Sequence, residues 1–246
     1  MALQVYRFAA GKGVEVDNPA EALARMAYAN FVPRERSLSR HGIKALLDGL
    51  EQTGTAPTLR LAVRFMLLTG VRQGEFIGAA WSEVDWERAQ WSIPAERMKA
   101  GKPYTVYLAE QSLDIVTTLG TCLPSSMYVH PSRDDSAGPL SQATLNRRIA
   151  AAVDRINGDR KPDQEPFLPV SVHDLRRMFS LRLDDALFPE ALIEACLAHQ
   201  QKDQVAAAYN HARLAGPRRA LMPLLGSGAE ALRLPIRASC RAAAPP

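Results

Sequence analysis

The sequence predicts a mainly α-helical fold that carries one small three-stranded antiparallel sheet. Most of the chain has apolar residues at helical spacing, as at Leu61, Phe65 and Leu68. Residues 83–108 instead contain short runs of strand-forming residues (VDW, QWSIP, YTVYL) separated by turn-forming ones. Hydrophobic residues make up 47% of the chain and charged residues 23%, a balance that is typical of a globular protein and excludes a disordered one.

The first 38 residues predict a helical remnant followed by a linker. A short helical pattern stops at AGKG (10–13), and Asn18 caps a second helix that begins with Pro19. The segment FVPRERSLSR (31–40) mixes proline, serine and charge, as linkers do. About 30 residues cannot bury a core of their own. We therefore expect residues 1–38 to be the truncated end of a larger helical domain, or a docking segment.

The rest of the chain predicts one domain over residues 39–225 and a flexible tail over 226–246. Its elements are expected in this order: helices at about 41–52 and 58–69, three strands within 83–108, helices at about 110–119, 141–156, 173–186 and 190–198, and a last pair around Tyr209 and at 217–225. Gly70 is the expected stop of the second helix. Residues 122–140 and 157–169 are rich in turn formers and are expected to be surface loops.

Charge and cysteine usage narrow the classes of function. The net charge of +4 slightly favours a phosphate-bearing partner. Cys122, Cys196 and Cys240 are far apart and odd in number, which fits neither a disulfide framework nor a metal knuckle and indicates a reducing cytoplasm. The chain has no signal-peptide pattern and no apolar run near the roughly 20 residues that span a bilayer. We expect no membrane partner.

Two motifs offer basic side chains in turns. In TGVRQGE (69–75), Arg72 follows a helix, and the plainest interpretation is a surface ion pair with Glu75. In ERMKAGKPYTVYL (96–108), Lys99 lies in a hairpin turn, where lysine is common because turns are solvated. A hairpin could also deliver a lysine to a leaving group, and Lys102 is the local rival. The spacing does not choose between them.

The motif SVHDLRR (171–177) is more specific. Ser171 and Asp174 form a capping-box pattern that starts a helix, with His173 in its first turn and Arg176 one turn later. Helix amides, an imidazole and a forked guanidinium together make a cradle for phosphate. The alternative is a capped helix with a solvated Arg176 and Arg177.

The last motif pairs a histidine with a tyrosine. His199 ends the apolar segment ALIEACLAH (191–199), and Tyr209 follows ten residues later in AAYNH (207–211). A histidine at a helix end is favourable against the helix dipole without any further role. A lone tyrosine is ordinarily a core or surface aromatic.

In order and spacing, the motifs resemble the catalytic set of the tyrosine recombinase family: TGxRxGE, a hairpin lysine, HxxR, LxH and a tyrosine. Within the family the chain is most similar to P4-phage-type integrases, through WSEVDW, WSIPAERMK, VHDLRRMF and AAYNHA. The resemblance covers about residues 18–225. It implies a tyrosine recombinase catalytic domain for residues 39–225, preceded by an incomplete core-binding domain.

The resemblance also implies a role for each candidate residue. Four basic side chains would form the phosphate cradle: Arg72, Arg176, His173 and His199. Tyr209 would attack the phosphodiester to form a 3′-phosphotyrosine and free a 5′-hydroxyl. The hairpin lysine, Lys99 with Lys102 in reserve, would protonate that leaving oxygen. Arginines and imidazoles suit this chemistry because the transition state accumulates negative charge.

The function that these residues imply is site-specific DNA recombination. The expected partners are double-stranded DNA and further copies of the chain, as a tetramer on DNA. No cofactor is expected, and the histidines and acidic residues show no metal-ligand spacing. The alternative is a truncated integrase remnant that binds DNA or protomers without completing recombination. Relaxation of the type IB topoisomerase kind is a more distant alternative.

Overall fold

The computed structural model describes residues 6, 8–9, 11–14, 38–123, 126–132, 138–199 and 214–222. The chain divides into two compact units, Met1–Arg36 and Ser37–Pro246. In the first unit the expected stop is present, since Gly13 has a φ of 78° and the amide of Val14 donates to the carbonyl of Ala9. The helix expected after Asn18 and the tail 226–246 lie outside the described residues. The predicted domain boundaries remain predictions.

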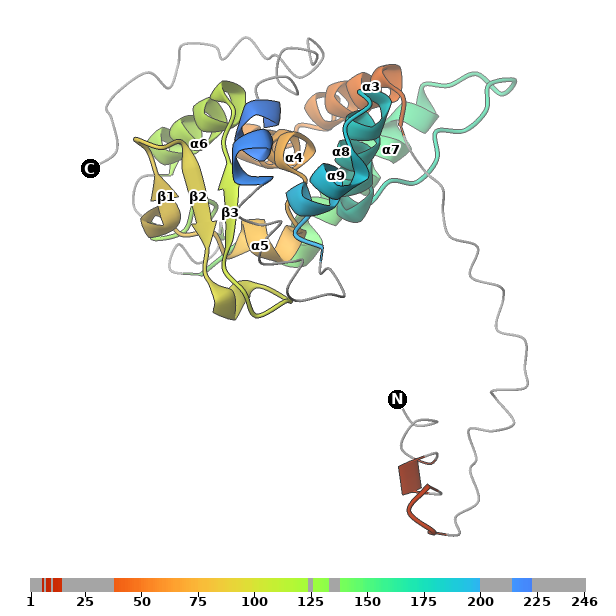
Figure 1. Cartoon of the computed structure of the whole chain (residues 1–246). Coiled ribbons are helices and arrows are strands. Elements are labelled where there is room, and N and C mark those ends of the chain that lie inside the picture. Colours follow the sequence, from red (N-terminus) through yellow and green to blue (C-terminus); the bar gives the residue numbers. More distant parts are fainter. Residues whose placement is uncertain are drawn as a thin grey trace. The chain divides into compact units, whose positions relative to one another are not determined.

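The second unit is mainly helical with one small sheet, as predicted (Figure 1). Its labelled helices are α3 (Arg40–Gln52), α4 (Pro57–Thr69), α5 (Gln73–Ile77), α6 (Glu110–Cys122), α7 (Gln142–Gly158), α8 (Val172–Asp185) and α9 (Glu190–Cys196). Its strands are β1 (Val84–Asp85), β2 (Gln90–Ile93) and β3 (Tyr104–Tyr107). Residues 214–222 form a further helix, shown in blue. Among the described helices, none has the length and apolar character needed to cross a membrane.

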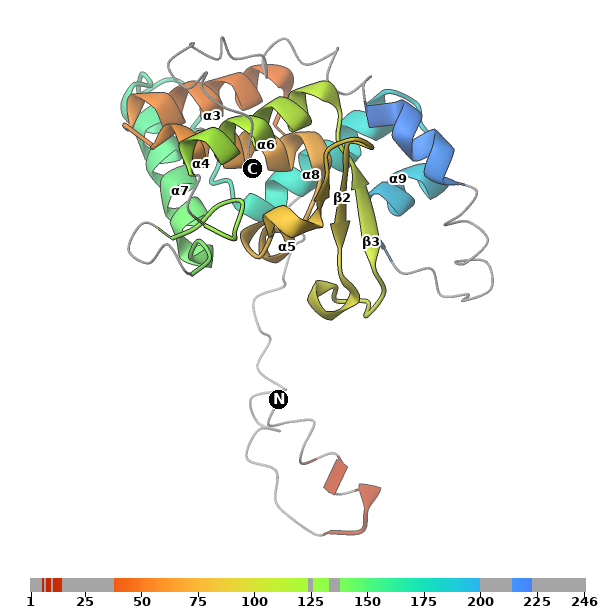
Figure 2. The same ribbon diagram turned by 90° about the vertical axis from the view of Figure 1, so that its left-hand side faces the viewer.

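Helix α4 is the centre of this unit. It packs against α6, α8 and α3 (Figure 2), and ten of its residues are buried, eight of them apolar, as expected of a helix that is covered on most sides. Pro57 occupies its first turn, where a missing amide proton costs nothing. Gly70 ends it in the left-handed conformation, with a φ of 64°. Start and stop both follow from the sequence.

The sheet has the strand order β1-β2-β3, and both pairings are antiparallel. Trp91 lies opposite Val106 and Ile93 lies opposite Tyr104. These four side chains are buried, while their neighbours along each strand are more exposed. The two-residue alternation read from the sequence therefore places one face of the sheet on the core.

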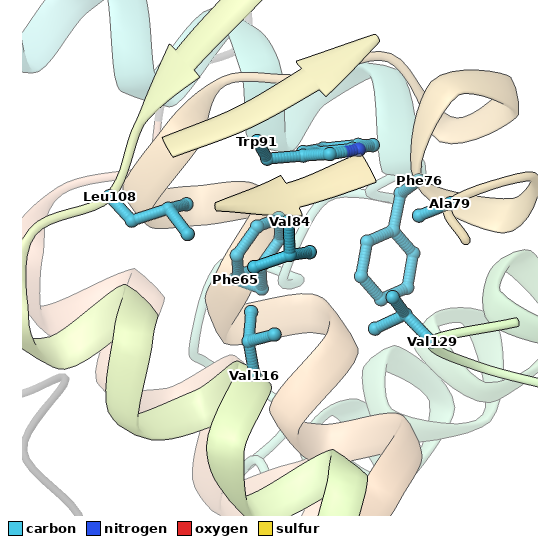
Figure 3. A pocket seen from close by; sticks show the side chains of 8 residues that line it. All are labelled: Phe65, Phe76, Ala79, Val84, Trp91, Leu108, Val116 and Val129. Carbon is cyan, nitrogen blue, oxygen red and sulfur yellow. The ribbon is translucent and has the colours of Figure 1, made fainter. Parts of the chain in front are cut away.

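A small apolar gap remains between the sheet and the helices (Figure 3). Its lining consists of Phe65, Phe76, Ala79, Val84, Trp91, Leu108, Val116 and Val129. The indole nitrogen of Trp91 already donates to Glu83, at 2.9 Å. Ligand sites need a few convergent polar groups besides an apolar wall. We therefore interpret this gap as a packing feature of the core.

The expectation of a surface loop over residues 122–140 is wrong for its middle part. Val129 and His130 are each only 3% exposed. The amide of Val129 donates to the carbonyl of Ala79 at 2.8 Å, and Tyr128 pairs with Ala80 in an isolated bridge. Turn-forming residues on both sides hid a short buried segment whose hydrogen-bond partners lie about 50 residues earlier in the chain.

Candidate active site

Arg72 precedes the first residue of α5 and is held there by Glu75. Its amide donates to one carboxylate oxygen of Glu75 at 2.7 Å, and its Nη1 donates to the other at 2.7 Å. The Glu75 side chain is buried, whereas 32% of the Arg72 side chain remains exposed. The plain ion pair expected from the sequence is therefore confirmed. It orients the guanidinium without burying it.

Arg176 is buried, so the interpretation of a solvated arginine is wrong. Only 6% of the residue is exposed. Its Nη1 donates to the carbonyl of Gly70 at 2.6 Å, and its Nη2 donates to the carbonyl of Leu197. One guanidinium thus joins the turn before Arg72, helix α8 and the end of α9.

The two arginines make this region electropositive. Burial, and then the positive charge of Arg72, lower the pKa of Arg176 to about 10. Arg176 therefore stays protonated at neutral pH, beside a second guanidinium. The negative charge of Glu75 opposes the shift. An anion bound between the arginines would relieve the remaining repulsion, because opposite charges favour the charged form of each group.

Helix α8 begins where the capping-box pattern predicts. The Asp174 carboxylate accepts from the amide of Ser171 at 2.9 Å and from its hydroxyl at 2.7 Å. His173 is exposed in the first turn of the helix, on the turn that precedes Arg176. The predicted placement of both residues on one helix is confirmed.

Asn146 of α7 links this helix start to the loop of Arg72, and sequence reasoning missed it. Its Oδ1 accepts from the amide of Val172 at 3.1 Å, and its Nδ2 donates to Gln73 at 3.4 Å. Gln73 in turn donates to the carbonyl of Gln142, at 2.5 Å. The sequence offers no signal for these contacts, which join residues 26 to 73 positions apart.

His199 lies just beyond the C-terminus of α9. Ala198 adopts a φ of 48°, and the amides of Ala198 and His199 donate to the carbonyls of Ala195 and Glu194. This is the helix-ending motif in which a left-handed residue usually is glycine. The His199 ring lies 2.7 Å, through Nδ1, from the Glu194 carboxylate and stays exposed.

The remaining carbonyls at this helix end are also bonded. The hydroxyl of Tyr104 donates to the carbonyl of Cys196 at 2.6 Å, and Arg176 bonds the carbonyl of Leu197. The last carbonyls of a helix lack partners within it. Here they are satisfied by residues of β3 and α8, which fixes the backbone that leads to His199.

The structure does not choose between the two hairpin lysines. Lys99 and Lys102 are both exposed in the connection between β2 and β3, on either side of Gly101, whose φ is 64°.

Arg97 connects this hairpin to the arginine site, and sequence reasoning missed it too. Its Nη2 donates to the carbonyl of Glu75 at 2.8 Å and lies 3.4 Å from the Glu83 carboxylate. The only signal available was its position two residues before Lys99. The contact ties the base of the lysine hairpin to α5.

Tyr209, the expected nucleophile, lies outside the described residues. Among the residues that are described, no group of three or more His, Cys, Asp or Glu side chains could hold a metal ion.

Gly70→Ala should lower the free energy of unfolding by roughly 2–5 kcal/mol, from left-handed strain and overpacking together. A Cβ at Gly70 would lie 2.4 Å from the ring of Phe179, which is fully buried. The matched control is Gly54→Ala, which has the same φ of 64° but nothing within 4 Å of the added carbon. Urea unfolding of both variants checks the prediction, and equal losses would contradict it.

The sequence model of the phage integrase family matches residues 36–215, and the chain belongs to that family. Prophage integrase IntA of Escherichia coli (strain K12) is 30% identical over 177 residues, which cover 72% of this chain and 40% of the relative. The integrase of Enterobacteria phage P4 is 28% identical over 165 residues, covering 62% and 35%. The chain thus spans about half or less of the length of the curated relatives it matches.

Solved structures agree on the fold. A lambda integrase(75–356) dimer bound to a COC′ core site matches with a TM-score of 0.60 at 20% identity, covering 85% of this chain and 69% of that one. A lambda integrase tetramer bound to a Holliday junction matches with a TM-score of 0.61 at 20% identity, covering 82% and 56%. The predicted tyrosine recombinase catalytic-domain fold is confirmed.

Proposed function

We propose that this chain cleaves and rejoins DNA as a site-specific recombinase of the integrase type. The observation that carries the proposal is the electrostatic pairing of two arginines: Arg176 is buried and anchored to the carbonyl of Gly70, two residues before Arg72, and the charge of Arg72 lowers the pKa of Arg176. The chain that carries this pair belongs to the phage integrase family. Surface arginines that serve solubility alone do not need a buried anchor of this kind.

In this proposal the arginines bind the non-bridging oxygens of the scissile phosphate. Arg72, oriented by Glu75, presents its exposed face, and Arg176 supplies charge from below the surface. His173 at the start of α8 and His199 at the end of α9 complete the cradle. These donors oppose the negative charge of the transition state from fixed positions, and no reorganisation is needed as it forms.

Tyr209 is the proposed nucleophile. Its oxygen forms a bond to phosphorus while the bond to the 5′-oxygen breaks, which leaves a 3′-phosphotyrosine and a 5′-hydroxyl. Lys99, with Lys102 as the rival, donates a proton to the departing 5′-oxygen. Because the phosphodiester energy is kept in the covalent intermediate, rejoining by the reverse step needs no ATP.

The proposed partners are duplex DNA and further copies of the chain. The lambda integrase structures support this, since one is a dimer on a core site and the other a tetramer on a Holliday junction. We propose a tetramer on DNA, acting in the cytoplasm on chromosomal or phage DNA without a metal or cofactor.

A nicked suicide substrate tests the function. The nick lets the strand beyond the cleavage site diffuse away, so the covalent protein–DNA adduct accumulates and can be counted on a denaturing gel. We expect an adduct that contains one strand linked through its 3′ end and that forms equally in EDTA. Binding without any adduct would favour the remnant hypothesis instead, and loss of cleavage in EDTA would indicate a metallonuclease.

Lys99→Ala should slow cleavage of an ordinary phosphodiester but not of a substrate whose bridging 5′-oxygen is replaced by sulfur. A thiolate departs without a proton, so deletion of the general acid then has little effect. Lys102→Ala is the matched control, because it removes the same charge from the same exposed turn. Sulfur rescue of Lys102→Ala, with none for Lys99→Ala, would reassign the role to Lys102.

A further inference from the structure

The side chain of Tyr104, on β3, reaches the end of α9. Its hydroxyl lies 2.6 Å from the carbonyl oxygen of Cys196 and 3.1 Å from that of Ala195. Burial raises the pKa of Tyr104 far above its usual value, so the hydroxyl keeps its proton and donates it. The bonded backbone lies three residues before His199 and leads directly into residues 200–213, which contain Tyr209.

The same tyrosine contacts the helix that follows Tyr209. The guanidinium carbon of Arg218 lies 4.6 Å from the ring centre of Tyr104 and 5.2 Å from that of Tyr107. Its Nη2 donates to the carbonyl of Thr105 at 2.5 Å. Figures 1 and 2 both show helix 214–222 beside β3. Arg218 is only 2% exposed.

An apolar cluster supports the arrangement. It consists of Ala109, Phe179, Leu183, Leu192, Ile193, Cys196, Leu197, Leu221 and Met222. An apolar residue at position 218 would extend this cluster without the cost of burying a charge. The guanidinium instead stacks on two rings and bonds a strand carbonyl, which only its planar, forked group can do at once.

We propose that Tyr104 and Arg218 form a junction that holds both sequence flanks of residues 200–213, the part of the sequence that contains the proposed nucleophile, and that the rate of adduct formation depends on this junction. This inference rests on the proposed function. Tyr104 and Arg176 donate to neighbouring carbonyls, those of Cys196 and Leu197. The end of α9, which precedes residues 200–213 in the sequence, is therefore held at a fixed distance from the proposed phosphate-binding Arg176. Strand β3 also follows the lysine hairpin directly, so the strand that carries Tyr104 is connected to the proposed general acid, Lys99 or Lys102.

Two variants test the junction from opposite sides. Tyr104→Phe deletes the hydroxyl but keeps the ring under Arg218, and Arg218→Met removes the guanidinium but keeps an apolar stem. Tyr128→Phe is the matched control, on a bridge with Ala80 that does not belong to the junction. Adduct formation at saturating suicide substrate, DNA affinity by anisotropy, and hydrogen exchange of the free full chain are measured for each.

We expect both junction variants to form the adduct about 10- to 100-fold more slowly at saturating DNA, as ångström-scale misplacement of a reacting group does. DNA affinity should stay within about twofold, because Tyr104→Phe removes no charge and the Arg218 guanidinium is buried and so cannot contact a phosphate directly. Amides of residues 197–199 and 214–222 should exchange about tenfold faster, while those of α4 should not change. A general loss of structure would speed the exchange of the α4 amides as well.

Adduct formation by both variants within twofold of the wild-type rate would overturn the positioning role, even with faster exchange. Unchanged exchange at both flanks would overturn the junction itself. If the wild-type chain forms no adduct on any substrate, the proposed function fails, and the exchange measurement alone then supports or rejects the junction.

Discussion

Tyr209→Phe will abolish the covalent protein–DNA adduct and leave DNA affinity within about twofold of the wild-type value. The substitution removes the one oxygen that can bond to phosphorus, so no slower route through the same side chain remains. It removes no positive charge, and affinity for DNA depends mainly on the number of phosphates that the protein neutralises.

The measurement uses the nicked substrate at saturating protein, followed by anisotropy over a series of salt concentrations. Tyr128→Phe serves as the control, since it makes the same chemical change in a tyrosine that the proposed mechanism does not use. Wild-type and control chains should form equal amounts of adduct. Persistence of the adduct in Tyr209→Phe would mean that another residue is the nucleophile and that the assignment from AAYNH is wrong.

The sequence predicts most of the fold because the relevant signals are local. The apolar spacing of α4 and its stop at Gly70 both lie within residues 57–70 themselves. The alternation of β2 and β3 is likewise short-range, and their antiparallel pairing follows from the turn between them. Tyr128 and Val129 escaped prediction because their backbone partners, Ala80 and Ala79, lie about 50 residues earlier in the chain.

The candidate site, too, could be predicted from the sequence only where its signals are local. Spacing places His173 and Arg176 on one helix and Arg72 beside Glu75, and the structure agrees. Spacing does not reveal that Arg176 is buried, because its two acceptor carbonyls are 106 and 21 residues away in sequence. Tyr104 has no sequence signal beyond that of an ordinary strand residue, since its contacts are equally remote.

Burial of the charged Arg176 lowers the stability of the folded chain. Folding lowers the pKa of Arg176 to about 10, so the folded chain holds this proton less tightly than the unfolded chain does. The protonated form is therefore penalised by folding at neutral pH. The penalty diminishes only as the pH rises through about 10, where the folded chain begins to release the proton first. A residue selected for stability alone would not carry this penalty, whereas a phosphate ligand requires the charge.

Arg176→Ala should lower the rate of adduct formation about 100- to 1000-fold at saturating DNA, the usual consequence of losing one preorganised donor to a developing charge. It should also lower the free energy of unfolding by roughly 1–3 kcal/mol, because the buried carbonyls of Gly70 and Leu197 lose their donor, an effect offset in part by relief of the buried charge. Arg177→Ala is the matched control on the same helix, as it removes one positive charge from a partly exposed neighbour.

Single-turnover cleavage, corrected for the folded fraction from urea unfolding, separates the two effects of Arg176→Ala. Arg177→Ala should weaken DNA binding slightly and reduce its salt dependence. It should leave the rate at saturating DNA within about threefold of the wild-type rate, since phosphate contacts outside the cradle contribute to affinity and not to the chemical step. Arg176→Lys should recover part of the stability but little of the rate, because an ammonium cannot bond two carbonyls and a phosphate in the geometry of a planar fork.

A folded Arg176→Ala chain that keeps more than about a tenth of the wild-type rate would fall well short of the loss expected for a transition-state donor. Arg176 would then be a structural brace between α4 and α9, and the phosphate would have to be held by Arg72 and the two histidines.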